Sequence, residues 1–261
     1  MKICISSNCQ GAGIATFLNL APNAKKYQVR EIPHLIQFYQ GLNPKAHPEF
    51  PPAEQERIVR EADIIFYHAK GGEEPDIIHQ NEKVPKIPLS VVYNSAYFMQ
   101  CWEDRKDFEP ILERARTEGV HAAVCYAVDE HDFGYEARWQ KNFEQMKKKE
   151  NDEEVPEATR ISPFFAASHR EHRPLITYNH PTSFIFYEWT DLILRHLNEP
   201  PLNPALRTRA ILEPNMAGLP CEFAVGNGAR KYMDLDWGGT PPEQASCDSI
   251  ARERINRWLN E

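Results

Sequence analysis

Short apolar runs that alternate with helix-like segments are the feature that most constrains the fold of this 261-residue chain. Several of these runs are apolar at nearly every position, which is typical of strands buried on both faces of a sheet. Strands are expected at residues 3–5, 27–32, 63–67, 89–93, 121–128 and 174–179, and helices at 14–18, 53–62, 108–116, 136–150, 183–197 and from Pro241 onward. This alternation predicts an α/β fold, with a mostly parallel sheet and helices on both faces.

The composition changes after Pro200-Pro201, where proline and glycine turns become frequent. We therefore expect residues 1–200 to form an α/β core that carries the site. Residues 201–261 are expected to form a C-terminal helical extension that packs on this core. A chain of this length can bury a substantial core, and we expect a single domain overall.

The net charge of the chain bears on whether it binds nucleic acids or anionic membranes. The formal net charge is −8, from 30 basic and 38 acidic residues, which argues against a nucleic-acid or anionic-membrane surface. No apolar run approaches the roughly 18 residues that span a bilayer, and the N-terminus resembles no signal peptide. We expect a soluble, cytoplasmic protein and leave oligomerisation open.

The six cysteines are scattered and contain no C-x-x-C pair, so reduced thiols are expected rather than disulfides or a zinc knuckle. His169 and His172 stand close together, but their spacing matches no standard zinc helix motif. The sequence therefore predicts no metal site.

A polar turn after the first apolar run contains the candidate nucleophile, Cys9. The turn reads Asn8-Cys9-Gln10-Gly11 and leads into a helix-like segment. Backbone N–H groups and the positive end of the helix dipole converge at such a position, which predicts a lowered thiol pKa and more thiolate. The alternative is a buried cysteine in an ordinary turn, since cysteine is often a small core residue.

Polar residues follow several of the expected strands, and parallel strands place their carboxyl ends at one edge of a sheet. Cys9, His68, Asn94, Asp129 and His180 are therefore expected at that edge. His180 is the sharper base candidate, because the proline after it suits the first turn of a helix. If His180 at one helix start faces the Cys9 thiol at another, the two can act as a catalytic Cys–His pair. The alternative is that His180 caps its helix or packs in the core.

Two motifs carry a resemblance to a known family. Asn8-Cys9-Gln10-Gly11, together with Asn179-His180-Pro181, resembles the WcbI-type polysaccharide-biosynthesis proteins, and more distantly the SGNH (GDSL-like) hydrolases. The resemblance implies a three-layer fold and a coenzyme A-binding acetyltransferase of capsule assembly, with a cysteine nucleophile. The chain departs from the SGNH pattern in having Cys9 in place of serine and Thr177 in place of the usual acid.

The resemblance also implies roles for further residues. His180 would take the Cys9 proton. The resemblance gives no position for the orienting acid; Asp129 is the candidate because it ends a neighbouring expected strand, and the alternatives are Glu188 or a Cys–His dyad without an acid. The candidate oxyanion and positioning groups are Asn8, the backbone N–H groups of Gln10 and Gly11, and the Asn94 amide. The candidate partners of the coenzyme A phosphates are Lys70, Arg170 and Arg173.

The implied reaction is acetyl transfer from acetyl-CoA to a hydroxyl of a sugar or glycan precursor. Two alternatives remain open on the sequence. One is an esterase or thioesterase of SGNH-like type, in which water accepts the acyl group. The other is a non-catalytic coenzyme A- or glycan-binding protein.

Overall fold

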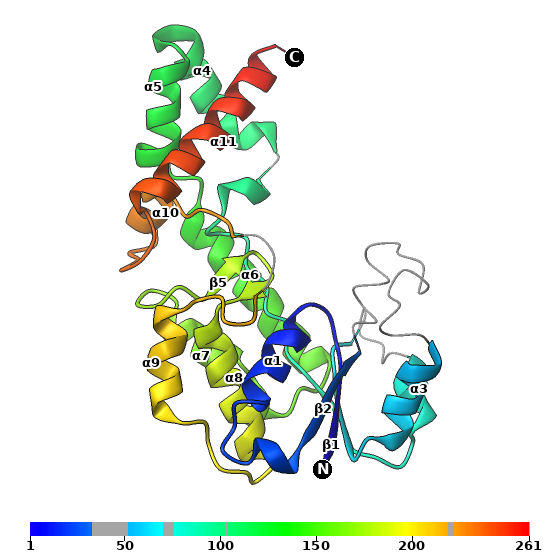
Figure 1. The fold of residues 1–261 in the computed structure, drawn as a ribbon. Helices are drawn as coiled ribbons and strands as arrows, with labels where there is room; N and C mark the ends of the chain where they lie inside the picture. Colours follow the sequence, from blue (N-terminus) through cyan, green and yellow to red (C-terminus); the bar gives the residue numbers. More distant parts are fainter. Residues whose placement is uncertain (33–51, 70–75, 103, 219–221, 261) are drawn as a thin grey trace. The chain divides into compact units, whose positions relative to one another are not determined.

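The computed structural model describes residues 1–32, 52–69, 76–102, 104–218 and 222–260 (Figure 1). The chain divides into two compact units, each assembled from three segments. Unit 1 contains Met1–Val92, Gln145–Phe165 and His180–Leu219, and unit 2 contains Tyr93–Glu144, Ala166–Asn179 and Pro220–Glu261. The expected division of the chain at residue 200 stays a prediction.

Unit 1 is built on a four-stranded parallel sheet, which confirms the predicted α/β class. Its strands are β1 (Lys2–Ser6), β2 (Gln28–Ile32), β3 (Ile64–Tyr67) and β4 (Lys86–Pro88), in the order β2-β1-β3-β4. The next strand in sequence, β2, pairs with one edge of β1, and the strand after it, β3, pairs with the other edge, so the strand order reverses at β1. In open α/β sheets, ligands bind beyond the carboxyl ends of the strands at such a reversal. The turn after β1 occupies this position.

Helix α3 (Pro52–Glu61) covers one face of the sheet. Cys4 and Ile65 from neighbouring strands pack with Ile58 and Val59 of this helix in one buried cluster. Side chains alternate between the two faces along a strand, so Ile5, next to Cys4, points to the opposite face.

Helix α1 (Gln10–Leu18) covers that opposite face, and α8 (Ser183–His196) packs against α1 (Figure 1). Two glycines of α1 permit this close approach. A Cβ atom on Gly11 would lie 3.1 Å from Cγ2 of Ile5, and one on Gly13 would lie 2.2 Å from the ring of Phe186. The expected arrangement of helices on both faces of the sheet is therefore confirmed in unit 1.

A buried carboxylate joins three segments of unit 1. Glu150 lies near the end of α6 (Tyr135–Asp152) and accepts a hydrogen bond of 2.5 Å from the Ser90 hydroxyl. It also accepts one of 3.2 Å from the backbone N–H of Ser162, the first residue of α7 (Ser162–Ser168). Glu150 thus connects the chain beyond β4 to two helices. The remaining regular elements of unit 1 are α9 (Pro204–Leu212) and the short β6 (His180–Pro181).

Unit 2 is mainly helical. It contains α4 (Glu109–Glu118), α5 (Val120–Cys125), a π-helical turn (Tyr126–Glu130), α10 (Asn227–Tyr232), α11 (Pro241–Leu259) and the short strand β5 (Leu175–Thr177). Buried Arg254 on α11 donates a hydrogen bond of 2.6 Å to the Met99 carbonyl, and Trp258 packs edge-on against Phe108 at 4.7 Å. The confirmed C-terminal helix is therefore part of the core of unit 2.

Short 3₁₀ helices complete the secondary structure of the two units. They are Ala24–Lys26, Asp76–Gln80, Met99–Cys101, Arg105–Phe108 and Glu157–Thr159. Among the helices of the described ranges, none combines the length and the apolar character needed to cross a membrane.

Three expectations for local structure are wrong. Residues 121–128 form α5 and the start of the π-helical turn instead of a strand, because a short apolar run is compatible with either state and Gly119, at φ 92°, ends α4 and begins α5. The fourth strand is Lys86–Pro88, just before the expected 89–93. Residues 162–168, for which neither a strand nor a helix is expected from the sequence, form α7.

The contact between α1 and α8 yields a test of the fold. Gly13→Ala raises intrinsic helix propensity by about 1 kcal/mol, yet we expect a net loss of about 1–3 kcal/mol of unfolding free energy, because the new methyl group overlaps Phe186. Urea denaturation measures the change. Phe186→Leu in the same chain should recover part of the loss, and additive losses would contradict the contact.

Candidate functional site

The turn that contains Cys9 is held by Asn8. The Asn8 side-chain oxygen accepts a hydrogen bond of 2.9 Å from the N–H of Gln10, and its carbonyl accepts one of 3.1 Å from the N–H of Gly11. Cys9 itself is the N-cap residue of α1 and is half-buried. A ligand oxyanion would have to replace Asn8 as the acceptor for the N–H groups of Gln10 and Gly11. The role of these two groups in an oxyanion hole therefore stays a prediction.

The Gln10 side chain fixes the start of α1 to the chain that follows β4. Its amide nitrogen donates to the Val92 carbonyl at 2.7 Å, and its amide oxygen accepts from the Val92 N–H at 3.1 Å. Both residues are buried. This pair of bonds satisfies the buried backbone groups of Val92 and joins the start of α1 to that segment.

The predicted lowering of the Cys9 pKa is wrong. The pKa of the Cys9 thiol is raised to about 11, mainly by burial and to a smaller degree by the negative charge of Glu31, and a backbone hydrogen bond opposes these effects only in part. Removal of the thiolate from water therefore outweighs the favourable position at the helix start. At neutral pH Cys9 is a thiol, and a reaction that uses its sulfur needs a base.

His180 lies in the same unit as Cys9, but its expected place at a helix start after a strand of the parallel sheet is wrong, because β5 is not one of the four parallel strands and α8 begins only at Ser183. It forms β6 with Pro181, and β6 packs against α1, the helix that Cys9 begins. Its ring is half-buried, and its Nδ1 atom has no hydrogen-bond partner among the residues that the structure describes. Burial lowers the pKa of His180, so the ring is neutral and able to accept a proton at pH 7.

The chain after His180 starts α8 without a side-chain cap from Thr182. The hydroxyl of Ser183 instead accepts a hydrogen bond of 2.7 Å from the Met216 N–H, while the Ser183 N–H donates to the Pro214 carbonyl at 2.7 Å. These two bonds fasten the start of α8 to a later loop of the same unit, and through it they limit the positions that the His180 backbone can adopt.

His68 follows β3, as expected, but it is a core residue. It is fully buried and stacks on Trp189 of α8 with ring centres 6.0 Å apart. Its backbone N–H donates to the carbonyl of Ser6 at 3.0 Å and extends the pairing of β3 with β1. The packing of this ring explains its position without a catalytic role.

The candidate acid Asp129 belongs to unit 2. Its expected place at the end of a strand is wrong, because it lies in the π-helical turn. One of its carboxylate oxygens accepts hydrogen bonds from Asn227 at 3.0 Å and from Gln244 at 2.9 Å. These bonds attach α10 and α11 to the turn, and a catalytic role for Asp129 stays a prediction.

Asn94 also belongs to unit 2 and is fully buried. Its side-chain oxygen accepts from the Ala96 N–H at 3.0 Å, and its amide donates to the Trp139 carbonyl at 3.3 Å. The side chain thus stabilises the start of unit 2. Its proposed contribution to an oxyanion hole stays a prediction.

The candidate phosphate ligands differ in their surroundings. Arg173 pairs with Glu222 at 2.9 Å and Glu243 at 3.1 Å within unit 2. Arg170 is exposed, and its ion pairs with Glu136 and Asp234 are long, at 3.5 and 3.7 Å. Arg170 is therefore the more readily available to an anion. Lys70 lies outside the described residues.

Sequence reasoning missed Glu31, which lies at the carboxyl end of β2. Burial raises the pKa of its carboxyl group to about 7. The available signal was an acidic residue near the end of the expected strand 27–32. A parallel strand that lies next to β1 ends at the same edge of the sheet as the Cys9 turn.

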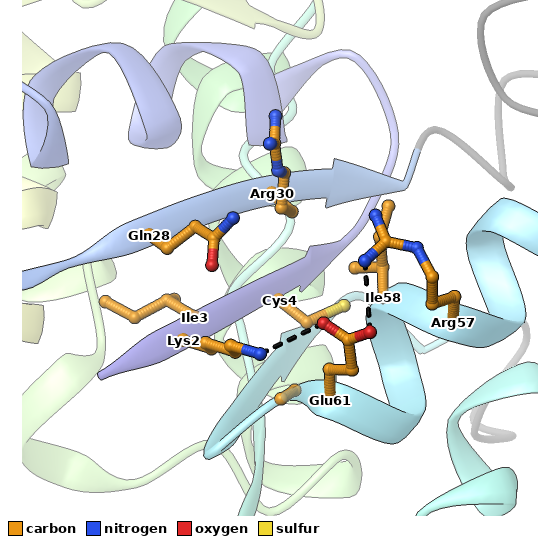
Figure 2. A pocket seen from close by; sticks show the side chains of 9 residues that line it. Lys2, Ile3, Cys4, Gln28, Arg30, Arg57, Ile58 and Glu61 are labelled. Atoms are coloured by element: carbon orange, nitrogen blue, oxygen red, sulfur yellow. Dashed lines mark hydrogen bonds and ion pairs between the residues drawn. The ribbon is translucent and has the colours of Figure 1, made fainter.

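A shallow pocket lies at the opposite end of the same sheet (Figure 2). Lys2 and Gln28, at the first positions of β1 and β2, line it together with Arg57 and Glu61 of α3. Glu61 accepts hydrogen bonds of 3.0 Å from both Lys2 and Arg57, as the dashed lines show. These are exposed ion pairs remote from the Cys9 turn. Within the described ranges, no three histidine, cysteine or acidic residues are grouped to hold a metal ion.

A comparison with solved structures finds a protein whose fold is similar to that of the whole chain. WcbI, described as a novel polysaccharide biosynthesis enzyme, aligns over 99% of this chain and 96% of its own, with a TM-score of 0.55 and 12% identity. This chain has the WcbI fold. No protein-family profile matches the sequence, and no curated protein matches it.

The raised pKa of Cys9 leads to a test by alkylation. Because only the thiolate reacts, iodoacetamide should label Cys9 slowly at pH 7, with a rate that rises about tenfold per pH unit toward the pKa of about 11. Peptide mass spectrometry measures the rate at Cys9, and circular dichroism confirms that the protein stays folded. A rate that levels off below pH 8 would contradict the raised pKa.

The bonds between Gln10 and Val92 lead to a test of stability. Gln10→Leu leaves two buried backbone groups without partners, and we expect a loss of about 2–4 kcal/mol of unfolding free energy in urea. Gln140→Leu, on the exposed surface of α6, is the matched control and should change stability by less than about 0.5 kcal/mol. Equal losses of unfolding free energy for the two substitutions would contradict a stabilising role of the Gln10–Val92 hydrogen bonds.

Proposed function

We propose that this protein transfers an acetyl group from acetyl-CoA to a sugar hydroxyl in polysaccharide biosynthesis, with Cys9 as the nucleophile. The observation that carries the proposal is the placement of Cys9 and His180 in one unit, on elements that pack together. Covalent acyl transfer by a thiol requires a base within reach of its sulfur, and a neutral imidazole can serve as that base.

The WcbI fold supports coenzyme A as the donor. The description of WcbI names a disulfide bond between coenzyme A and a cysteine, which the native protein lacks. In this chain, Cys9 lies in the turn after β1, at the reversal of strand order where open α/β sheets bind ligands. In this turn, the sulfur of bound coenzyme A would lie next to the Cys9 sulfur.

The reaction proceeds in two halves. In the first, the Cys9 sulfur loses its proton to a base and attacks the thioester carbon; the bond from that carbon to the coenzyme A sulfur breaks, and coenzyme A leaves with the proton. In the second, a base takes the proton of the sugar hydroxyl, the oxygen attacks the acetyl carbon, and the bond to Cys9 breaks, which restores the thiol. His180 is the base that the sequence motif offers for these steps.

The resting state fits this order of events. With a thiol pKa of about 11, Cys9 remains protonated until an acyl donor is bound. An empty site therefore holds little thiolate for oxidation or unwanted alkylation. The neutral imidazole of His180 has an acceptor nitrogen ready when the donor arrives.

Acetylation of Cys9 tests the proposal directly. After incubation with acetyl-CoA, we expect the Cys9 peptide to gain one acetyl group, and we expect His180→Gln to slow this step by about 10²–10⁴-fold, the usual contribution of a general base. Peptide mass spectrometry over a time course measures both effects. Cys125→Ala, which removes an exposed thiol, is the control and should leave the rate unchanged.

Three outcomes would contradict the proposal in different ways. Acetylation of other cysteines at the same rate would show chemical labelling. A coenzyme A-dependent rise in melting temperature without acetyl-Cys9 would indicate a binding protein. Rapid turnover of acetyl-CoA by water, with no transfer to added sugars, would indicate a thioesterase.

A further inference from the structure

Glu31 lies beside the end of β1 in the register of the sheet. In the parallel pairing of β1 with β2, Ile5 is opposite Glu31 and Ser6 is opposite Ile32. The pairing continues one residue further, since the Ser7 N–H donates to the Ile32 carbonyl at 3.1 Å. Glu31 is therefore at the carboxyl edge of the sheet, where the chain turns toward Cys9.

Strand alternation decides which face Glu31 occupies. Ile32 and Cys4 belong to the buried cluster on the α3 side. Paired residues of parallel strands share a face, so Glu31 shares the opposite face with Ile5. That face carries α1, because a Cβ on Gly11 would lie 3.1 Å from Ile5, and α1 packs against β2. Glu31 thus lies on the side of the sheet from which Cys9 starts α1.

Few other charges face this carboxyl group. Helix α1 carries no charged residue. On β2 itself, Arg30 lines the pocket on the α3 side (Figure 2). On β1, Lys2 is at the far end of the strand. The turn between β1 and α1 brings Cys9 to this side, and the negative charge of Glu31 acts on its thiol. His180 lies on β6, which packs against α1.

We propose that Glu31 is the carboxyl group of the Cys9 site: when ionised it holds the thiol in its protonated form, and it receives the thiol proton when Cys9 attacks an acyl donor. This inference rests on the acyl transfer proposed above. It adds Glu31 to the first proton transfer, beside His180, and leaves His180 alone to act on the acceptor hydroxyl in the second half of the reaction. The proton returns from Glu31 to the departing coenzyme A sulfur.

The pKa values of the three groups support this division. Burial raises the pKa of Glu31 to about 7, whereas burial lowers the pKa of His180 below its ordinary value of 6.5. Ionised Glu31 is therefore the stronger base of the two. The same carboxylate raises the pKa of Cys9, which shows that their charges interact.

Glu31→Gln tests the inference because it should move two rates in opposite directions. Alkylation of Cys9 by iodoacetamide should match the wild-type rate below about pH 6, where Glu31 is protonated, and exceed it several-fold above about pH 8, where the carboxylate has been lost. Acetylation of Cys9 by acetyl-CoA at pH 8 should fall by at least about tenfold, because the base is missing.

Arg30→Gln is the matched control, since it removes a charge from the neighbouring position on the other face of β2. It should leave both rates within about twofold of wild type, well below the effect of a lost general base. Circular dichroism and melting temperature confirm that each variant is folded.

An alkylation profile for Glu31→Gln that matches wild type at every pH would overturn the inference, as would equal losses of both rates, which indicate a structural role. A wild-type protein that alkylates as expected but never acetylates would refute the acyl transfer instead. In that case the alkylation profile would still decide whether Glu31 controls the Cys9 thiol.

Discussion

The close packing of α1 on the sheet is the constraint on which the rest of unit 1 depends. A Cβ atom on Gly11 would lie 1.7 Å from the Ser7 hydroxyl oxygen, and one on Gly13 would lie 2.2 Å from the ring of Phe186, so neither position has room for a side chain. The helix can therefore lie low over β1 and β2 and begin directly after the turn that contains Cys9. A bulkier helix would stand further from the sheet, and Cys9 would be separated from Glu31 and from β6.

This low position of the helix also determines the chemistry of the thiol. A helix start favours negative charge, but the effect is modest and depends on access to the backbone N–H groups. Those of Gln10 and Gly11 donate to Asn8. Burial and a nearby carboxylate then dominate and make Cys9 a protected thiol. A thiol of this kind reacts as a nucleophile only after a base has removed its proton.

The predictions from sequence were accurate where one structural state was strongly favoured. Tyr27–Ile32 and Asp63–Tyr67 lie in or around real strands, and the helix expected from Pro52 and the helix after His180 are present. They failed at residues 121–128, where alanine and valine suit a buried helix as well as a strand and where Gly119 set the start of the helix. Because of this error, Asp129 was expected at the end of a strand, whereas it lies in the π-helical turn. Its assignment to the site therefore has no structural support.

The sequence by itself determined the α/β class, the turn that presents Cys9, and the helix that follows His180. These depend on local patterns of apolar and turn-forming residues, which a single chain displays directly. Only the tertiary structure decided that His68 is a core residue, that the Cys9 thiol has a raised pKa, and that Glu31 lies on the face of the sheet that α1 covers. Those properties arise from burial and strand register, which depend on residues distant in sequence and therefore leave no local pattern.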